Sequence, residues 1–275
     1  MISTQTIRVN NLEVNVKERK GQEPALIFLH GNSMSSKIWQ KQLAAPALQS
    51  YKIILIDLPR HGDSLPSPDP ANDYNVPGYA AILQKILLKL ELRQYILIGL
   101  SLGGNVALEL LPHLPAEACR GVMVTGTAIV DTLPTLGKAF LPNPATGSLF
   151  KGACTPAELT ALLKTMSGRD NPEALPGFVA TDFSKTDPDC RAYLGASIGQ
   201  GNFGNEITHV TETAIPVAVI TGAAEQIINN GYLAALAVPM WRDQVPVIPA
   251  AGHLPQWENE AAFNELLLAF VQDYT

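Results

Sequence analysis

The sequence predicts an α/β fold in which a mainly parallel, twisted sheet carries helices on both faces. Three observations predict it. Short, nearly continuous apolar runs recur along the 275 residues, and apolar residues at helical spacing lie between most of these runs. Because parallel strands are buried on both faces and are joined by helical crossovers, this alternation is typical of a parallel sheet. One interval between two late strands spans about 90 residues, which is too long for a single crossover and predicts an inserted subdomain.

The first expected element is an antiparallel N-terminal hairpin at the edge of the sheet. Residues 7–17 alternate apolar and polar side chains on the two sides of an Asn10-Asn11 turn. Parallel strands are expected in the apolar runs at 25–29, 53–56, 95–98, 122–124, 217–220 and 245–248. Apolar residues at helical spacing predict helices around 82–90, 102–111 and 263–271.

The long interval is expected to form a small, mostly helical cap. Its predicted bounds are residues 128–209, between a first core segment at 1–127 and a second at 210–275. Within it, Thr155-Pro156-Ala157-Glu158 has the pattern of a capping box with proline at the first helical position, and Ser167-Gly168 ends that helix. The cap is thus predicted to lie between two late strands.

The motif that points most directly to chemistry is Gly99-Leu100-Ser101-Leu102-Gly103, which matches G-x-S-x-G. It lies between the strand expected at 95–98 and the helix expected at 102–111, and this strand, turn and helix are the context that the motif requires. A serine in such a strained turn needs small neighbours, and the strain aims its hydroxyl outward. We therefore predict Ser101 as a nucleophile and the Leu102 N–H as an oxyanion donor. The alternative is an ordinary glycine-rich turn.

A serine nucleophile needs a base and an acid that orients the base. His253 is the predicted base, because it follows the last expected strand and active sites of open α/β sheets gather at the carboxyl ends of strands. Glu225, in the loop after the strand at 217–220, is the predicted acid. Asp131, a few residues past the strand at 122–124, is the alternative acid. The Asn32 N–H, in a loop near the first parallel strand, is the predicted second oxyanion donor.

Composition and spacing limit the expected ligands and location. No two histidines have metal-ligand spacing, and the glycine-rich turn lacks the features of a nucleotide-binding loop, so neither a metal nor a cofactor is expected. The net charge of −6 disfavours nucleic acid and membrane partners. The cap is expected to supply an apolar wall and few charged groups lie near the motifs, so a small neutral or apolar acyl substrate is expected. The three cysteines lack C-x-x-C spacing, and no apolar signal segment or membrane span is visible, so a cytoplasmic location is expected.

Four motifs together resemble the α/β-hydrolase superfamily. They are LHGN at 29–32, DLPRHGDS at 57–64, GLSLGG at 99–104 and AGH at 251–253, in the family's order and spacing. Serine at the elbow sets the chain apart from haloalkane dehalogenases and epoxide hydrolases, which carry aspartate there. HGNS together with a glutamate at 225 is similar to the metal-independent N-acyl homoserine lactone hydrolases and related esterases. Two departures from the family pattern are Glu225, where aspartate is usual, and Arg60, where glycine is common.

The sequence therefore predicts a serine hydrolase that cleaves a carboxylic ester or lactone through an acyl-enzyme. Two alternatives remain open. One is a C–C bond hydrolase or a cofactor-free perhydrolase that uses the same three residues. The other is a small-molecule-binding protein that keeps the fold without turnover.

Overall fold

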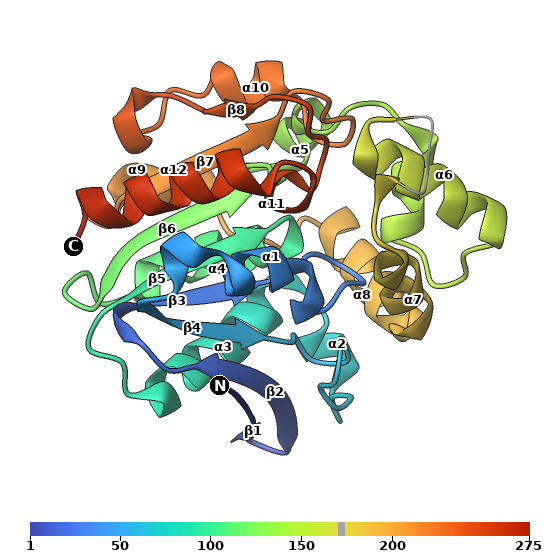
Figure 1. Ribbon diagram of the computed structural model, residues 1–275. Helices are drawn as coiled ribbons and strands as arrows, with labels where there is room; N and C mark the ends of the chain where they lie inside the picture. The colour runs from blue at the N-terminus through green and yellow to red at the C-terminus, as the bar shows by residue number, and fades with distance from the viewer. Residues whose placement is uncertain (170–173) are drawn as a thin grey trace.

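The sheet of the computed structural model has eight strands in the order β1-β2-β4-β3-β5-β6-β7-β8 (Figure 1), and the structure describes residues 1–169 and 174–275. The strands are β1 (Ile2–Val9), β2 (Leu12–Arg19), β3 (Gln22–Leu29), β4 (Tyr51–Ile56), β5 (Tyr95–Leu100), β6 (Cys119–Thr125), β7 (Val217–Gly222) and β8 (Val247–Ile248). β1 and β2 form an antiparallel hairpin at the edge, and β2 is also antiparallel to β4; every later pair in this order is parallel. The predicted fold class is confirmed.

Two details at the ends of the sheet have local causes. Asn10 in the hairpin turn has φ of 56°, a left-handed conformation that asparagine tolerates better than most residues. The last strand is shorter than the predicted run at 245–248, because ladder pairing begins at Val247. Pro246 has no N–H to donate to a ladder, and only its carbonyl takes part, by accepting a hydrogen bond from the Thr221 N–H.

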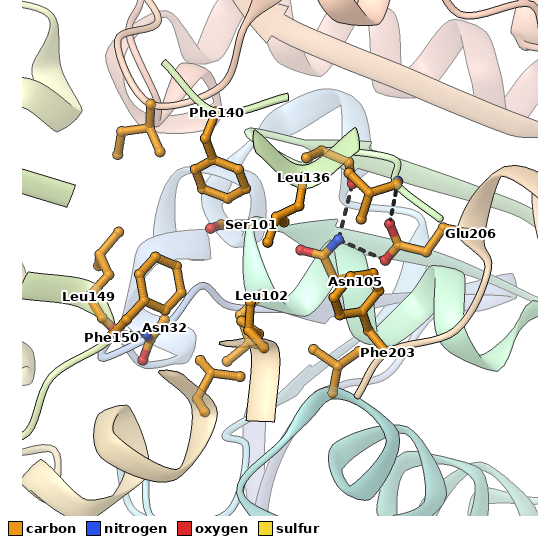
Figure 2. Close-up of a pocket in the computed structure, with 16 residues that line it drawn as sticks. Asn32, Ser101, Leu102, Asn105, Leu136, Phe140, Leu149, Phe150, Phe203 and Glu206 are labelled. Carbon is orange, nitrogen blue, oxygen red and sulfur yellow. Dashed lines mark hydrogen bonds between the residues drawn. The ribbon is translucent and has the colours of Figure 1, made fainter. Parts of the chain in front are cut away.

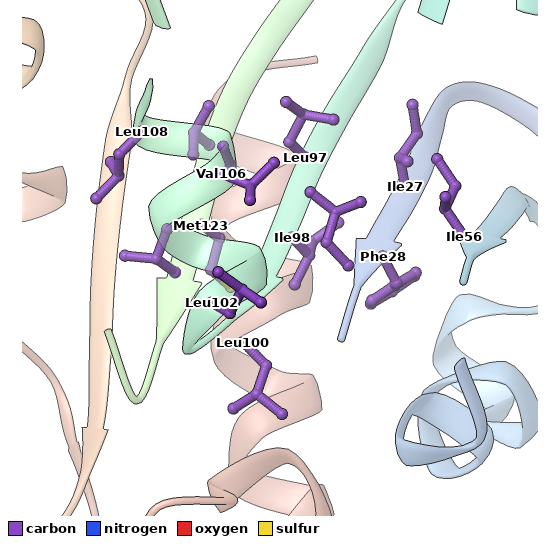
Figure 3. Packing of buried hydrophobic residues seen from close by; sticks show 14 of the residues in the cluster. Ile27, Phe28, Ile56, Leu97, Ile98, Leu100, Leu102, Val106, Leu108 and Met123 are labelled. Atoms are coloured by element: carbon purple, nitrogen blue, oxygen red, sulfur yellow. The ribbon is translucent and has the colours of Figure 1, made fainter. Parts of the chain in front are cut away.

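Helices cover both faces of the sheet, as predicted. Among the described residues they are α1 (Gln40–Ala44), α2 (Pro70–Asp73), α3 (Val76–Leu90), α4 (Leu102–Leu110), α5 (Leu133–Ala139), α6 (Pro156–Ser167), α7 (Gly177–Lys185), α8 (Pro188–Gly199), α9 (Glu206–Glu212), α10 (Asn230–Ala234), α11 (Pro255–Glu258) and α12 (Glu260–Asp273). Figure 3 shows α4 on one side of β5 and β6 and the C-terminal helix on the other. None of the helices in the described part of the chain is long and apolar enough to cross a bilayer.

The core lies where α4 packs on the central strands. Leu97, Ile98 and Met123 of β5 and β6 are fully buried, as is Val106 of α4 (Figure 3). These branched and flexible apolar side chains interlock between helix and sheet and exclude water from both. The packing holds the first turn of α4 rigidly against the end of β5, which is where the G-x-S-x-G motif lies.

The segment between β6 and β7 is helical and gathers at one end of the sheet, where Figure 1 shows α6, α7 and α8 together. We call residues 128–209 the cap segment; residues 170–173 within it lie outside the described part. The predicted capping box is present, since the Thr155 side chain accepts from the Glu158 N–H and Glu158 accepts from the Thr155 N–H. Gly168 ends α6 in a left-handed conformation.

Ion pairs join the cap segment to the core. Arg60, one of the two departures from the family pattern, lies 3.1 Å from Asp187 at the start of α8. Lys37 lies 3.5 Å from Asp182 of α7, whose carboxylate also accepts a hydrogen bond from the Ser35 hydroxyl. Arg60 therefore contacts the cap segment instead of remaining an isolated charge.

Candidate active site

Ser101 lies in a strained turn between β5 and α4. Its φ is 50° and ψ is −117°, a conformation that a residue with a side chain adopts only when the surroundings enforce it. Its backbone N–H donates to the Thr125 carbonyl at 2.9 Å, which fastens the turn to the end of β6. The turn is also crowded, because a Cβ on Gly99 would lie 2.5 Å from the Gly103 carbonyl oxygen and the Gly104 Cα. The glycines of the motif thus allow the chain to reverse tightly under the serine.

His253 and Glu225 form a buried pair. Glu225 follows β7 and His253 follows β8, and His253 Nδ1 lies 2.7 Å from one carboxylate oxygen of Glu225. The other carboxylate oxygen accepts a hydrogen bond from the Ile227 N–H at 2.7 Å. The Glu225 side chain is fully buried and that of His253 is 2% exposed. A charge-bearing pair so enclosed interacts strongly, because little water screens it.

The backbone around His253 is held from two directions. The His253 N–H donates to the Met166 carbonyl of α6 at 2.7 Å. One carboxylate oxygen of Glu258 accepts hydrogen bonds from Gly252 at 2.8 Å and Leu254 at 3.2 Å. Because its neighbours on both sides are tied to one carboxylate, the imidazole has little freedom to turn away.

Asp131, the alternative acid, lies in a different environment. Its carboxylate accepts hydrogen bonds from the hydroxyls of Thr132 and Thr135 at the start of α5. The hydrogen bond from Thr135 is the main cause that lowers the pKa of Asp131. Its described contacts therefore belong to the start of a helix, whereas Glu225 contacts the histidine.

The ends of β5 and β6 place Ser101 and His253 on the same edge of the sheet. Leu100, directly before the serine, pairs with Thr125, and Gly126 follows. A Cβ on Gly126 would lie 2.8 Å from the His253 carbonyl and 3.0 Å from its imidazole Cε1. The imidazole thus packs against the strand end to which the Ser101 backbone is bonded.

The loop at 30–33 approaches the serine from the other side. A Cβ on Gly31 would lie 3.4 Å from the Ser101 Cβ, at van der Waals contact, so this loop lies directly beside the serine. The Asn32 side chain donates to the Leu149 carbonyl of the cap segment and accepts from the Ser33 hydroxyl. Arg191, a buried residue of α8, donates in turn to Ser33 at 3.2 Å. The backbone N–H of Asn32 donates to no other residue that the structure describes.

His30 and His61 serve their own loops. His30 Nδ1 lies 2.7 Å from the Gly31 carbonyl, and its Nε2 accepts from the Leu58 N–H at 2.9 Å. His61 Nδ1 lies 3.0 Å from the Pro59 carbonyl. Burial lowers the pKa of His30 and lowers that of His61 to about 3, so both rings are neutral at physiological pH. They order the two loops beside the pocket.

The serine opens into a mostly apolar pocket (Figure 2). Its apolar lining residues are Val76, Leu102, Ala128, Val130, Leu136, Phe140, Leu149, Phe150, Leu194, Ile198, Phe203 and Ile227. Many of them come from the cap segment, which therefore supplies much of the wall. The pocket has the character of a site for a neutral, apolar group.

Two polar lining residues, Asn105 and Glu206, are absent from the sequence predictions. Asn105 lies one helical turn after Ser101, and this spacing alone is a signal that it faces the same side of α4. Glu206 begins α9, 101 residues later in the chain, and is hydrogen-bonded to Asn105 at 2.8 Å. No local pattern marks a single glutamate as a pocket residue.

Among residues 1–169 and 174–275, no three histidine, cysteine, aspartate or glutamate side chains gather as a metal site would require.

Comparison with known families assigns the fold. A sequence model described as the alpha/beta hydrolase fold matches residues 24–260. The structure also matches a variant of the N-acyl homoserine lactonase AidH in complex with N-hexanoyl homoserine, with a TM-score of 0.92 and 26% identity over 100% of this chain and 98% of that one.

Two further proteins are similar. A 2-hydroxy-6-oxononadienedioate/2-hydroxy-6-oxononatrienedioate hydrolase of Pseudomonas sp. is 24% identical over 95% of this chain and 92% of its own. The esterase RhEst1 of Rhodococcus sp. ECU1013 has a TM-score of 0.77 at 22% identity, over 100% of this chain and 99% of that one, which is a likeness of fold.

Proposed function

The chain belongs to the α/β-hydrolase fold family, and we propose that it is a serine hydrolase that cleaves a carboxylic ester or lactone through an acyl-enzyme. The observation that carries the proposal is the strained Ser101 in the lining of an apolar pocket, on the same sheet edge as the buried His253 and Glu225 pair. Fold alone would not support an activity, since this fold hosts many.

The proposed reaction uses these residues in two half-reactions. His253 takes the proton of the Ser101 hydroxyl, and the serine oxygen attacks the substrate carbonyl carbon. The N–H groups of Leu102 and Asn32 donate to the negative oxygen that forms. The leaving alcohol receives the proton from His253, and the acyl group stays on Ser101. His253 then removes a proton from water, whose oxygen attacks the acyl-enzyme carbonyl, and it returns that proton to the Ser101 oxygen as the carboxylic acid leaves.

Glu225 has a separate role in this scheme. Its carboxylate, 2.7 Å from Nδ1, holds the imidazole in the tautomer whose Nε2 is free to accept the serine proton. Glutamate is one methylene longer than the usual aspartate. The longer side chain has one more rotatable bond. The second carboxylate oxygen of Glu225 accepts a hydrogen bond from the Ile227 N–H, and this contact fixes the position of the carboxylate.

An N-acyl homoserine lactone is the first specific substrate to test. The similarity to AidH supports it, and so does the apolar wall, which suits an acyl chain. A panel of N-acyl homoserine lactones and p-nitrophenyl esters, assayed with wild type and Ser101→Ala, tests the class and the nucleophile together. Hydrolysis of some members by wild type alone is expected, and equal rates for the two proteins would refute the proposal.

A C–C bond hydrolase is the second candidate, favoured by the similarity to the Pseudomonas hydrolase. That protein's named substrates are dioates, which carry two carboxylates. The described lining of this pocket contains no lysine, arginine or histidine to bind a carboxylate, and it does contain the acid Glu206. The pocket therefore favours neutral esters or lactones.

A binding protein without turnover is the remaining alternative. A fluorophosphonate probe distinguishes the two, because it labels a serine only when a base activates it. Stoichiometric labelling of wild type and none of Ser101→Ala is expected.

A further inference from the structure

Two polar side chains of the pocket, Asn105 and Glu206, have no part in the proposed reaction. Both line the same pocket as Ser101, whose wall is otherwise mostly apolar (Figure 2). Asn105 Nδ2 donates to a carboxyl oxygen of Glu206 at 2.8 Å. Burying polar side chains among apolar ones costs free energy unless hydrogen bonds compensate for the lost water. We therefore asked what this hydrogen-bonded pair contributes to the pocket.

The surrounding groups determine how the Asn105 amide is turned. Its Nδ2 group donates to the Ala128 carbonyl at 3.0 Å as well as to Glu206. A carbonyl oxygen can only accept, so turning the amide over would place two acceptors against each other. The side-chain oxygen Oδ1 therefore points away from these partners, and Figure 2 shows it turned away from Glu206.

Glu206 is itself held in place. It is 1% exposed, and its second carboxyl oxygen accepts from the Val130 N–H at 2.9 Å. Burial raises the pKa of Glu206 to about 8, against the opposing effect of the hydrogen bonds from Asn105 and Val130, and the nearby Glu109 raises it further. The pair is therefore neutral at pH 7, and it anchors the Asn105 amide without adding a charge to the pocket.

Asn105 lies close to Ser101, the proposed nucleophile, in the chain and in the pocket. The Asn105 N–H donates to the Ser101 carbonyl at 3.0 Å, so the two residues are one helical turn apart. Both residues also line the same pocket, so a substrate whose carbonyl carbon is attacked by Ser101 occupies the space that the Asn105 amide faces.

We propose that Asn105 is a specificity-determining residue whose side-chain oxygen accepts a hydrogen bond from an O–H or N–H group on the acyl part of the substrate. Because Asn105 follows Ser101 by four residues and lines the same pocket, we assign the donor to a carbon near the scissile carbonyl, either the adjacent carbon or the following one. The inference rests on the proposed function and narrows its substrate class. Hydroxyacyl or acylamino esters and lactones should thus be preferred over plain fatty esters.

The competing explanation is that the pair only holds the structure together. Asn105 and Glu206 do connect α4, the loop after β6 and α9. A structural role would affect all substrates alike, whereas recognition would affect only those that carry the donor. The test therefore compares substrates within each variant.

Two matched ester pairs supply the comparison. The first pair is p-nitrophenyl 3-hydroxybutanoate and its 3-methoxy analogue, and the second is p-nitrophenyl N-acetylglycinate and its N-methyl analogue. In each pair, methylation removes the donor and leaves the rest of the acyl group. The measured quantity is the ratio of kcat/KM for the donor ester to that for its methylated analogue.

Asn105→Leu is the test variant, and Asn143→Leu is its control. Asn143 is also a half-buried asparagine, but it bonds to Thr165 within the cap segment and does not line the pocket. In wild type and Asn143→Leu we expect a ratio of about 3 to 10 in at least one pair, the effect of one neutral hydrogen bond. In Asn105→Leu the ratio should fall to about 1, and the pair that responds identifies the donor as hydroxyl or amide.

Two results would overturn the inference while leaving the proposed function intact. One is a wild-type ratio near 1 in both pairs with both esters hydrolysed. The other is an unchanged ratio in Asn105→Leu, including a case in which both rates fall equally. If no ester is hydrolysed and no fluorophosphonate label is incorporated, the proposed function is refuted and this inference with it.

Discussion

Replacing Glu225 with glutamine tests the proposed catalytic residues with the smallest change in shape. One Glu225 oxygen contacts His253 Nδ1 at 2.7 Å, and the other accepts from the Ile227 N–H at 2.7 Å. Glutamine has only one acceptor oxygen, so it cannot satisfy both partners. The side chain is fully buried, which leaves no water to replace the lost contact.

Either orientation of the new amide impairs the histidine. If the glutamine oxygen stays on the Ile227 N–H, the amide N–H groups face His253 Nδ1 and force the proton onto Nε2. That tautomer cannot accept the proton of Ser101. If the oxygen faces Nδ1 instead, the tautomer survives, but the charge that stabilises the imidazolium is lost and two N–H donors meet at Ile227. Comparable changes lower turnover by about 10⁴-fold, and we expect a loss of 10³-fold or more here.

The assay is steady-state hydrolysis of the best p-nitrophenyl ester, with Asp131→Asn as the matched control. Asp131 is hydrogen-bonded to Thr132 and Thr135 at the start of α5. Asp131→Asn should therefore lower turnover much less than Glu225→Gln does. Thermal unfolding of each variant checks that folding is intact. The reverse ranking of the two variants, or more than a tenth of wild-type turnover in Glu225→Gln, would refute the reasoning.

Four further predictions follow from the site. Ser101→Ala should lower kcat by on the order of 10⁴-fold or more, because nucleophile and base act as a unit; retention of a tenth of the activity would contradict its role. Dialysis against EDTA should leave the rate unchanged, because the oxyanion donors supply the polarisation; a loss restored by zinc would disprove this. Lengthening an unsubstituted acyl chain should raise kcat/KM by roughly fourfold per methylene until the pocket is full, from about 0.8 kcal/mol per buried methylene; flat rates would show that the apolar wall does not bind the chain. Finally, the pKa of Glu206 is raised to about 8 by burial, so the folded state binds a proton that the unfolded state releases near its ordinary value. The stabilisation from this group is complete below that ordinary pKa and is lost as the pH rises toward 8, by about 1.4 kcal/mol per unit; unfolding of Glu206→Gln should show a flatter pH dependence over that window.

The sequence by itself determined the fold class and the principal candidates. Continuous apolar runs specify strands buried on both faces, and the pattern is local, so it can be read without knowing what the strands pack against. The capping box at Thr155 and the elbow at Ser101 are likewise short-range, because each depends on residues within one turn of chain. His253 and Glu225 could be proposed because parallel strands bring their carboxyl ends to one edge.

Only the tertiary structure decided which side chains contact one another. Glu225 and Asp131 both follow strands, and the sequence could do no more than prefer one of them; the 2.7 Å contact to His253 depends on how the loops after β7 and β8 pack. Asn105 and Glu206 lie 101 residues apart, so no periodicity connects them. Their pairing exists because α9 packs beside α4, and the direction of the free Asn105 oxygen depends on a carbonyl from a third segment. A hydrogen bond is directional and short, so a pocket's chemistry is defined only when distant parts of the chain are packed to within a few tenths of an ångström.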